Sequence, residues 1–334
     1  MRRPDPTFEG PLFVVGMPRS GTKLLRGLLN QHPLIGIPKA ETEFLPDWAR
    51  RWSSFGDLSR PDAFRRFFAA VRGSSYFVFL REEQGTEVDP AAWHATCRDF
   101  GLQGVFEALI RLDGGVGAGP GVWGDKSPGY IARLPLLDTL FPQCRVIHIV
   151  RDCRDYALSI EKAWGKDPLR AAQRWNDRVR DARAFGQGLG PARYHELRYE
   201  DLLADPEAAL RPVCGFLGLD FDPAMLTLQR PTENLGDTRG EARIVSANTE
   251  KWRAMEPALR EHIEALAGQT LAELGYPVSH AGPPERLGPL RMAAGQLFDG
   301  AQLLRGDVAE RGLFAAVRFR ARIFAESGTR ESFS

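Results

Sequence analysis

The chain has 334 residues, of which 43% are hydrophobic and 26% are charged, so its composition is that of a folded globular protein. Its 44 lysines and arginines nearly balance 43 acidic residues, which argues against a general electrostatic attraction to nucleic acid or to acidic membranes. We therefore expect one main domain with an appendage, in which any binding of anions is local.

The beginning of the chain shows no export signal. Its first ten residues contain two arginines, but Asp5 and Glu9 interrupt them and no apolar core of signal-peptide length follows. No uninterrupted apolar run approaches the roughly 20 residues that are needed to cross a bilayer. The sequence therefore predicts a cytoplasmic protein without an integral membrane segment.

The four cysteines show no C-x-x-C spacing and no histidine at metal-ligand spacing. We expect them to be reduced core thiols and expect no metal site. Cys153 allows a second interpretation, because it lies between Arg151 and Arg154, whose positive charge would lower the pKa of its thiol.

Short apolar runs alternate with helical patterns along the chain. Residues 11–16 and 145–150 are typical of strands buried on both faces of a parallel sheet, and residues 193–198 are a third candidate. Leucines at helical spacing follow Gly21 and end before Pro33, and a helix-compatible stretch covers 152–164. Asp205-Pro206 and Glu256-Pro257 each open a further helix, the second capped by Gly275. This alternation predicts an α/β fold with parallel strands.

Two regions stand apart from this pattern. Residues 47–120 mix helical and irregular signals, so we expect a variable, lid-like insertion. Its aromatic residues could line an apolar pocket, but such spacings are more typical of a core. Residues 279–334 are a basic, amphipathic appendage that could dock on the main domain, pair two protomers into a homodimer or lie on a membrane surface. Its arginines are Arg311, Arg318, Arg320 and Arg322.

The segment from Gly16 to Lys23 predicts an anion site. A glycine loop between a buried strand and a helix directs backbone N–H groups and the positive end of the helix dipole at one place. The string Gly-Met-Pro-Arg-Ser-Gly-Thr-Lys has the spacing of a Walker A loop. That motif, however, ends in Gly-Lys-Ser/Thr, which weakens the interpretation as a nucleoside triphosphatase or kinase.

The residues Pro18-Arg19-Ser20-Gly21-Thr22 resemble the loop of the sulfotransferases that use 3′-phosphoadenosine 5′-phosphosulfate (PAPS), especially the bacterial branch similar to tyrosylprotein sulfotransferases. The resemblance implies a P-loop-type, three-layer α/β/α fold with a central parallel sheet. It also implies that the loop, here Arg19, Ser20, Gly21, Thr22 and Lys23, binds the 5′-phosphosulfate, with Arg19 at the transferring group. Lys23 stands where the family usually has a threonine, so an ammonium would replace a hydroxyl contact.

The second element of the resemblance is the strand 145–150, which delivers Arg151 to its carboxyl end, where open α/β sheets bind ligands. By resemblance, Arg151 and Ser159 hold the 3′-phosphate that distinguishes PAPS from ATP, and an arginine fork suits that phosphate. The alternative is an ion pair of Arg151 with Asp152 or Asp155. We expect His148, inside the strand, to be a core residue.

The acceptor side requires a base for the hydroxyl and positive charge near the transferring oxygens. The segment Ala40-Glu-Thr-Glu-Phe-Leu-Pro46 resembles the one that carries the family's base, and an alignment with one extra residue assigns that role to Glu41. Glu43 is the alternative base. Trp123-Gly-Asp-Lys-Ser-Pro128 resembles the segment whose lysine lies near the bridging oxygen of the donor, which assigns that role to Lys126.

Two further residues complete the implied donor site. Tyr199, in Leu-Arg-Tyr-Glu-Asp-Leu, is a candidate contact to the adenosine, although an aromatic residue that packs on the sheet at a helix start is nearly as good an interpretation. Lys251 lies in Ser-Ala-Asn-Thr-Glu-Lys-Trp, which resembles the segment that closes over the nucleotide. The expected cofactor is PAPS, with no metal required, and the acceptor is a small-molecule, carbohydrate, lipid or peptide hydroxyl or an amine.

Two other functions remain open at this stage. A P-loop nucleotide kinase is one, and it is disfavoured by the sequence of the loop. A non-catalytic nucleotide-binding protein is the other, because a fold does not determine a function. The order of the motifs over residues 10–275 favours the sulfotransferase.

Overall fold

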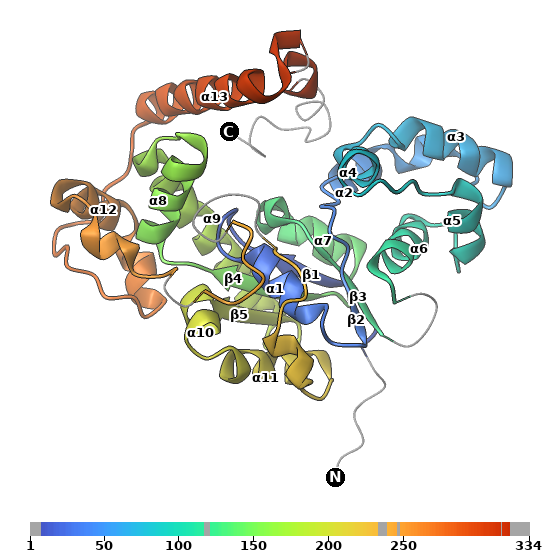
Figure 1. The fold of residues 1–334 in the computed structure, drawn as a ribbon, viewed down its shortest axis with the longest axis horizontal. Helices are drawn as coiled ribbons and strands as arrows, with labels where there is room; N and C mark the ends of the chain where they lie inside the picture. The colour runs from blue at the N-terminus through green and yellow to red at the C-terminus, as the bar shows by residue number, and fades with distance from the viewer. Residues whose placement is uncertain (1–7, 117–120, 233–238, 246–247, 315, 321–334) are drawn as a thin grey trace.

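The computed structural model describes residues 8–116, 121–232, 239–245, 248–314 and 316–320. Its centre is a five-stranded parallel sheet in the order β2-β3-β1-β4-β5 (Figure 1). The strands are β1 (Leu12–Val15), β2 (Ile35–Gly36), β3 (Val122–Lys126), β4 (Arg145–Val150) and β5 (Tyr194–Arg198).

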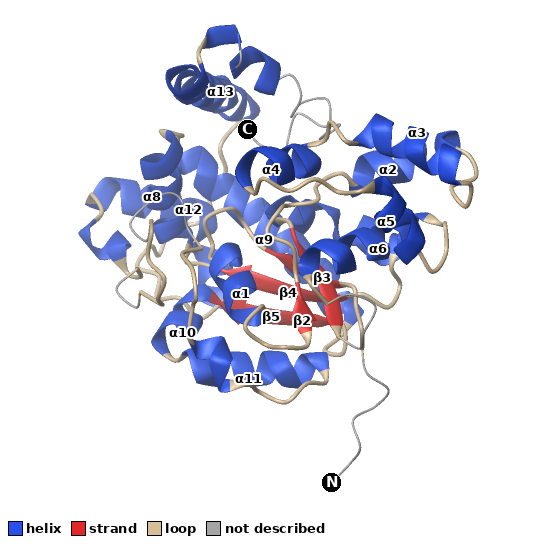
Figure 2. Cartoon of the chain, turned by 45° about the vertical axis from the view of Figure 1, so that its right-hand side comes forward, coloured by secondary structure: helices blue, strands red, loops and turns tan. Residues whose placement is uncertain are grey.

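Helices cover both faces of the sheet, which confirms the predicted α/β/α fold (Figure 2). They are α1 (Thr22–Leu29), α2 (Leu45–Arg51), α3 (Pro61–Val71), α4 (Ser75–Glu83), α5 (Pro90–Thr96), α6 (Leu102–Gly114), α7 (Leu134–Leu140), α8 (Cys153–Trp164), α9 (Pro168–Leu189), α10 (Tyr199–Ala204), α11 (Pro206–Leu217), α12 (Pro257–Glu273) and α13 (Pro289–Arg311). Short 3₁₀ helices lie at Trp52–Phe55, Pro128–Arg133, Pro223–Leu226 and Lys251–Ala254. None of the described helices is long and apolar enough to cross a membrane.

The two cores follow from the alternation of side chains along buried strands. In β1, Leu12 and Val14 pack with α1, α10 and α11, whereas Phe13 and Val15 pack in the larger core on the opposite face. All four residues are fully buried. An apolar residue is therefore needed at every position of β1, which explains the continuous run by which this strand was predicted.

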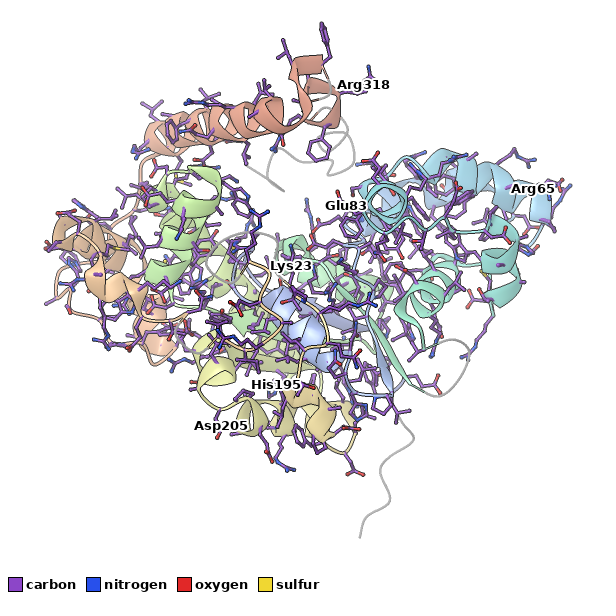
Figure 3. All side chains as sticks on the ribbon, viewed as in Figure 1. Lys23, Arg65, Glu83, His195, Asp205 and Arg318 are labelled. Carbon is purple, nitrogen blue, oxygen red and sulfur yellow. The ribbon has the colours of Figure 1, made fainter. Side chains whose placement is uncertain are left out.

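The predicted helix boundaries have local causes. The Asp152 side chain accepts from the backbone N–H of Arg154 and begins α8, and Asp205 accepts from that of Ala208 at the start of α11 (Figure 3 labels Asp205). Gly275 has a φ of 77° directly after α12, a conformation that suits glycine. Strands β2 and β3 and the 22-residue helix α9 were not predicted.

The segment 47–120 is mostly helical and packs around a buried aromatic cluster. Trp48, Phe64, Phe67 and Trp93 are each at most 2% exposed and contact one another at ring-centroid distances of 5.1–6.2 Å. Such rings provide the core of this part of the protein, so they do not line an open acceptor pocket. The core interpretation of these aromatic residues is the one that the structure supports.

Candidate active site

Lys126, Arg151 and Tyr199 lie in or directly after the carboxyl end of a strand, and residues 19–23 form the loop and the first helical turn that follow β1. The parallel sheet brings these ends to one edge, and the chain order changes direction at the central strand β1, with β3 on one side and β4 on the other. In open α/β sheets this edge is where ligands bind. The site therefore forms where the sheet topology predicts it.

The loop between β1 and α1 has the backbone conformation of an anion cradle. Arg19 has a φ of 70° and Gly21, which caps α1, has a φ of 89°. A Cβ atom at Gly21 would lie 2.3 Å from the Tyr199 ring, so a side chain does not fit. The hydroxyl oxygen of Ser20 is buried and has no hydrogen-bond partner among the described residues, as expected of a group that binds a ligand oxygen. Thr22 is buried, and Lys23, in the first turn of α1, is partly exposed (Figure 3).

Arg151 connects this loop to the segment after residue 247. Its Nη1 donates to the carbonyl oxygen of Arg19 at 3.0 Å and its Nη2 to that of Asn248 at 3.1 Å. Its buried Nε has no hydrogen-bond partner among the described residues. The alternative ion pair with Asp155 is present only at 4.0 Å, whereas Asp152 pairs with Arg154. Arg151 thus keeps one donor for an anion.

Ser159 lies on α8 and faces the loop. The Nε of Arg19 donates to its hydroxyl oxygen at 3.4 Å, so the two predicted phosphate elements are in direct contact. A ligand oxygen bound here could contact both the Arg19 guanidinium and the Ser159 hydroxyl. The structure thus brings Arg19, Arg151 and Ser159 to one place although they are distant in sequence.

Tyr199 and Lys251 meet at a residue that was not predicted. The side-chain amide of Asn248 donates to the Tyr199 hydroxyl at 2.7 Å, and its amide oxygen accepts from the Lys251 ammonium at 2.5 Å. The Tyr199 ring lies 4.9 Å from the guanidinium carbon of Arg151. Asn248 occurs in the same quoted segment as Lys251, but a single asparagine in a loop carries no signal of its own. A pocket opens between these groups, lined by Arg19, Gly21, Leu24, Arg151, Tyr199, Leu203, Thr232, Glu241, Arg243, Val245 and Asn248.

Glu41 and Lys126 form an ion pair on the acceptor side. Lys126 is the last residue of β3, lies level with Val14 of β1 and is only 1% exposed, whereas the Glu41 side chain is 29% exposed. A lysine that is buried to this degree requires a partner, because an unpaired charge in the interior is costly. The pair places a carboxylate that solvent can reach beside a buried cation.

Glu43, the alternative base, has a different environment. Its backbone has a φ of 40°, and its carboxylate accepts from the backbone N–H of Gly129 at 3.1 Å. Burial, followed by the charges of Glu41 and Asp125, raises the pKa of Glu43 to about 8. The two carboxyls thus differ in their surroundings: Glu43 is held by a backbone N–H and has a raised pKa, whereas Glu41 is paired with Lys126 and is accessible to solvent.

Asp125 extends the acidic character of this region. It is fully buried in β3, and burial raises its pKa to about 7 although the Ser127 and Thr42 hydroxyls and Lys126 lower it. The backbone N–H of Thr42 donates to the Ser127 hydroxyl at 2.9 Å, and the Thr42 hydroxyl lies 2.8 Å from that of Tyr130. These contacts fix the backbone at Thr42, between Glu41 and Glu43. Nothing in the local sequence indicates this support.

Two other candidates are core residues. His148 is fully buried with its Nδ1 2.6 Å from the Tyr194 hydroxyl, and burial lowers the pKa of its imidazole to about 3. Cys153 is also fully buried, and burial raises the pKa of its thiol well above the usual value despite Arg154. The interpretation of Cys153 as an activated thiol is therefore wrong, because desolvation outweighs the neighbouring positive charge.

Comparisons with known proteins identify the family of the chain. The family model described as "Sulfotransferase family" matches residues 11–223. An omega-hydroxy-beta-dihydromenaquinone-9 sulfotransferase of Mycobacterium bovis is 34% identical over 113 residues, which are 29% of each chain. A putative protein-tyrosine sulfotransferase of Caenorhabditis briggsae is 26% identical over 229 residues, covering 66% of this chain and 69% of that one.

The extent of these matches differs. An uncharacterized protein of Aquifex aeolicus is 25% identical over 275 residues, but this chain spans only 32% of its length. This chain likewise spans less than a third of the mycobacterial relative. Among solved structures, the sulfotransferase domain of the Synechococcus PCC 7002 olefin synthase is 26% identical with a TM-score of 0.53, covering 83% of this chain and 99% of that one. The sulfotransferase domain from the curacin biosynthetic pathway has a TM-score of 0.55 at 21% identity, over 82% of this chain and all of that one.

Proposed function

This chain belongs to the sulfotransferase family, and we propose that it transfers a sulfuryl group from PAPS to an acceptor hydroxyl or amine by in-line displacement. The observation that carries the proposal is the arrangement at the edge of the sheet. Arg19, Arg151 and Ser159 converge on one side of β1, and the Glu41–Lys126 pair lies at the end of the adjacent strand. The residues that would bind a polyanionic donor and the residue that would accept a proton thus lie at the same edge of the sheet.

The donor fits the residues on its side of the site. In the proposal, the loop from Arg19 to Lys23 holds the 5′-phosphosulfate, with the Ser20 hydroxyl as one donor. Arg151 and Ser159 hold the 3′-phosphate, for which the Nε of Arg151 is available. Tyr199 and Lys251 flank the nucleotide. Hydrogen bonds from a guanidinium to a phosphate are among the strong ones in proteins.

The chemistry follows from the positions of the charges. The acceptor oxygen attacks the sulfur, its proton passes to the Glu41 carboxylate, and the bond from the sulfur to the 5′-phosphate oxygen breaks. 3′,5′-Adenosine bisphosphate (PAP) leaves with that electron pair. Arg19 and Lys126 offset the negative charge that develops on the transferring and bridging oxygens, which is the main contribution expected of a preorganised site. No step in this proposal requires a metal.

The proposal assigns residues 1–278 to the catalytic domain and 47–120 to the cover of the acceptor side. The acceptor is a small-molecule, carbohydrate, lipid or peptide group. The two related sulfotransferases have a dihydromenaquinone and a protein tyrosine in their names, so the names do not narrow the class of acceptor.

The nucleotide preference tests the proposal. PAP at about a hundred times its dissociation constant should stabilise the fold by about 2.7 kcal/mol, because a ligand that binds only the native state shifts the unfolding equilibrium. ATP with magnesium should stabilise it much less, since ATP lacks the 3′-phosphate. Equal shifts in thermal melts would contradict the assignment of Arg151 and Ser159 and would favour a kinase. Transfer of labelled sulfate from PAPS in an acceptor screen distinguishes an enzyme from a nucleotide-binding protein.

A further inference from the structure

Helix α13 and the residues that follow it turn apolar side chains outward. Of the eight large apolar side chains that are exposed in the described part of the chain, six lie here: Leu290, Leu297, Phe298, Leu313, Phe314 and Val317. Leu290 is 88% exposed and Phe314 is 85% exposed. Single exposed apolar residues are ordinary, but a contiguous group of this kind marks an interaction surface. We call these six residues the outer apolar face.

The helical spacing makes this face continuous along α13. Leu290, Ala294, Leu297 and Ala301 follow one another at intervals of four, three and four residues, so they lie on one stripe, and all four are exposed. Phe298 lies beside the stripe. At 1.5 Å per residue the stripe is about 16 Å long. Leu313, Phe314 and Val317, which are also exposed, follow the end of the helix in the chain, next to Arg318, which Figure 3 labels at the outer edge of the molecule.

The opposite face of α13 is polar and is fixed by contacts with the start of α9. Asp299 is 1% exposed, forms an ion pair with Arg170 and accepts from the backbone N–H of Asp167 at 2.9 Å. Gly295 packs so closely that a Cβ atom there would lie 2.8 Å from the Cδ of Arg170. If α13 rotated to bury the apolar stripe, Asp299 would move away from Arg170. The buried charge of Arg170 would then be unpaired, which is strongly destabilising. The outward orientation is thus built into the packing.

Positive charge lies beside the outer apolar face. Arg305 and Arg318 are exposed, whereas Asp299 and Asp307 are held in ion pairs with Arg170 and Arg320. An occupant of this face should therefore be apolar at its centre and negatively charged around it.

We propose that the outer apolar face docks on an anionic lipid surface, with Leu290, Leu297 and Phe314 at the acyl boundary and the arginines at the headgroups. An apolar stripe flanked by basic residues is the pattern of helices that lie in a membrane interface. A second copy of the chain fits less well. A two-fold interface pairs the same patch with itself, so it would enclose Arg305 and Arg318 of both copies without an added negative charge. The proposal does not depend on the proposed activity.

Vesicle binding by the full chain tests this proposal. The probes are vesicles of phosphatidylcholine alone and of phosphatidylcholine with phosphatidylglycerol, and the variant is Leu290→Glu/Leu297→Glu/Phe314→Glu. We expect the wild type to sediment with the anionic vesicles and the variant to lose about tenfold or more in partitioning, because each buried apolar side chain contributes substantially to such binding. The matched control is Leu34→Glu/Leu112→Glu, which changes two leucines that are each 41% exposed elsewhere on the surface. The control should bind as the wild type does.

A second variant distinguishes a loss of binding from misfolding of the triple variant. Arg305→Glu/Arg318→Glu keeps the apolar residues and should lose binding to anionic vesicles, with high salt acting in the same direction on the wild type. Equal binding by wild type and the triple variant, or no binding of the wild type, would overturn the proposal. A wild-type dimer that the triple variant converts to a monomer in sedimentation velocity, without vesicle binding, would show that the face pairs two copies instead.

Discussion

The two sides of β1 differ in the sign of the charge that they present. Toward β4 and β5, the cations Arg19, Arg151 and Lys251 gather around backbone carbonyls, hydroxyls and an amide. Toward β3, a single buried lysine, Lys126, lies among the carboxylates of Glu41, Glu43 and Asp125. The first arrangement suits a polyanionic ligand and the second suits the removal of a proton.

The two sides also differ in how their charge depends on pH. An arginine stays protonated in any site, so the β4 side keeps its positive potential at all ordinary pH values. Burial, and to a smaller extent the neighbouring carboxylates, raises the pKa values of Glu43 and Asp125. A cluster whose charge is insensitive to pH thus lies beside a cluster whose charge responds to pH. The following predictions test this contrast, from the largest effect to the smallest.

Replacement of the proposed base should give the largest effect. Glu41→Gln keeps the size of the side chain but cannot accept the proton of the acceptor, so kcat should fall by about 10²–10⁴. The affinity for PAP, measured by calorimetry, should hardly change, because the group acts on the acceptor side and in the transition state. Glu43→Gln is the matched control. If Glu43→Gln abolished turnover while Glu41→Gln retained it, Glu43 would be the base.

Replacement of Arg151 should weaken the binding of the donor nucleotide. Arg151→Ala loses charge-assisted hydrogen bonds that are worth about 1.5–3 kcal/mol each, so PAP affinity should fall by about 10- to 100-fold. Because Arg151 also donates to the carbonyl oxygens of Arg19 and Asn248, the melting temperature must be measured in parallel. Arg151→Lys is the control that keeps the charge without the fork. A variant that fails to fold while Arg151→Lys binds PAP as well as the wild type does would assign the arginine a structural role only.

The hydroxyl on α8 should contribute less than the guanidinium. Ser159→Ala removes one neutral hydrogen bond of about 0.5–1.5 kcal/mol, which corresponds to a loss of about 2- to 10-fold in PAP affinity. The loss should be absent for adenosine 5′-monophosphate, which has no 3′-phosphate. An equal loss for both nucleotides would place Ser159 at the 5′ side of the site, where Arg19 already contacts it.

The buried carboxyl of Glu43 should make the free energy of unfolding depend on pH. The pKa of Glu43 is raised from 4.5 to about 8, so the folded state binds more protons than the unfolded state between these values. Its contribution to stability is therefore complete below about pH 4.5 and is lost as the pH rises toward 8. Glu43→Gln should make the free energy of unfolding flatter over this window. Urea titrations at several pH values measure it, and Gln103→Glu, a change at an exposed position on α6, should leave the wild-type slope unchanged.

Local sequence determined the elements that carry their own signal. The strand 145–150 and the helix that begins after Asp152 were predicted at the observed positions, because six consecutive residues suit a doubly buried strand and the aspartate caps the helix. The phosphate loop was recognisable for the same reason, since Gly21 must adopt a positive φ at a fixed distance from the buried strand. These features depend on residues that are neighbours in the chain.

Strand β3 escaped prediction because Gly124, Asp125 and Lys126 are not typical of a buried strand. Only the sheet explains them: a Cβ atom on Gly124 would lie 2.4 Å from the carbonyl oxygen of Leu12, and Lys126 is buried because Glu41 compensates its charge. The acidic cluster, the role of Asn248 and the outward face of α13 were likewise hidden. Each arises between segments that are distant in sequence, where burial and the partner across the interface, not the local pattern, determine the charge and the orientation of a side chain.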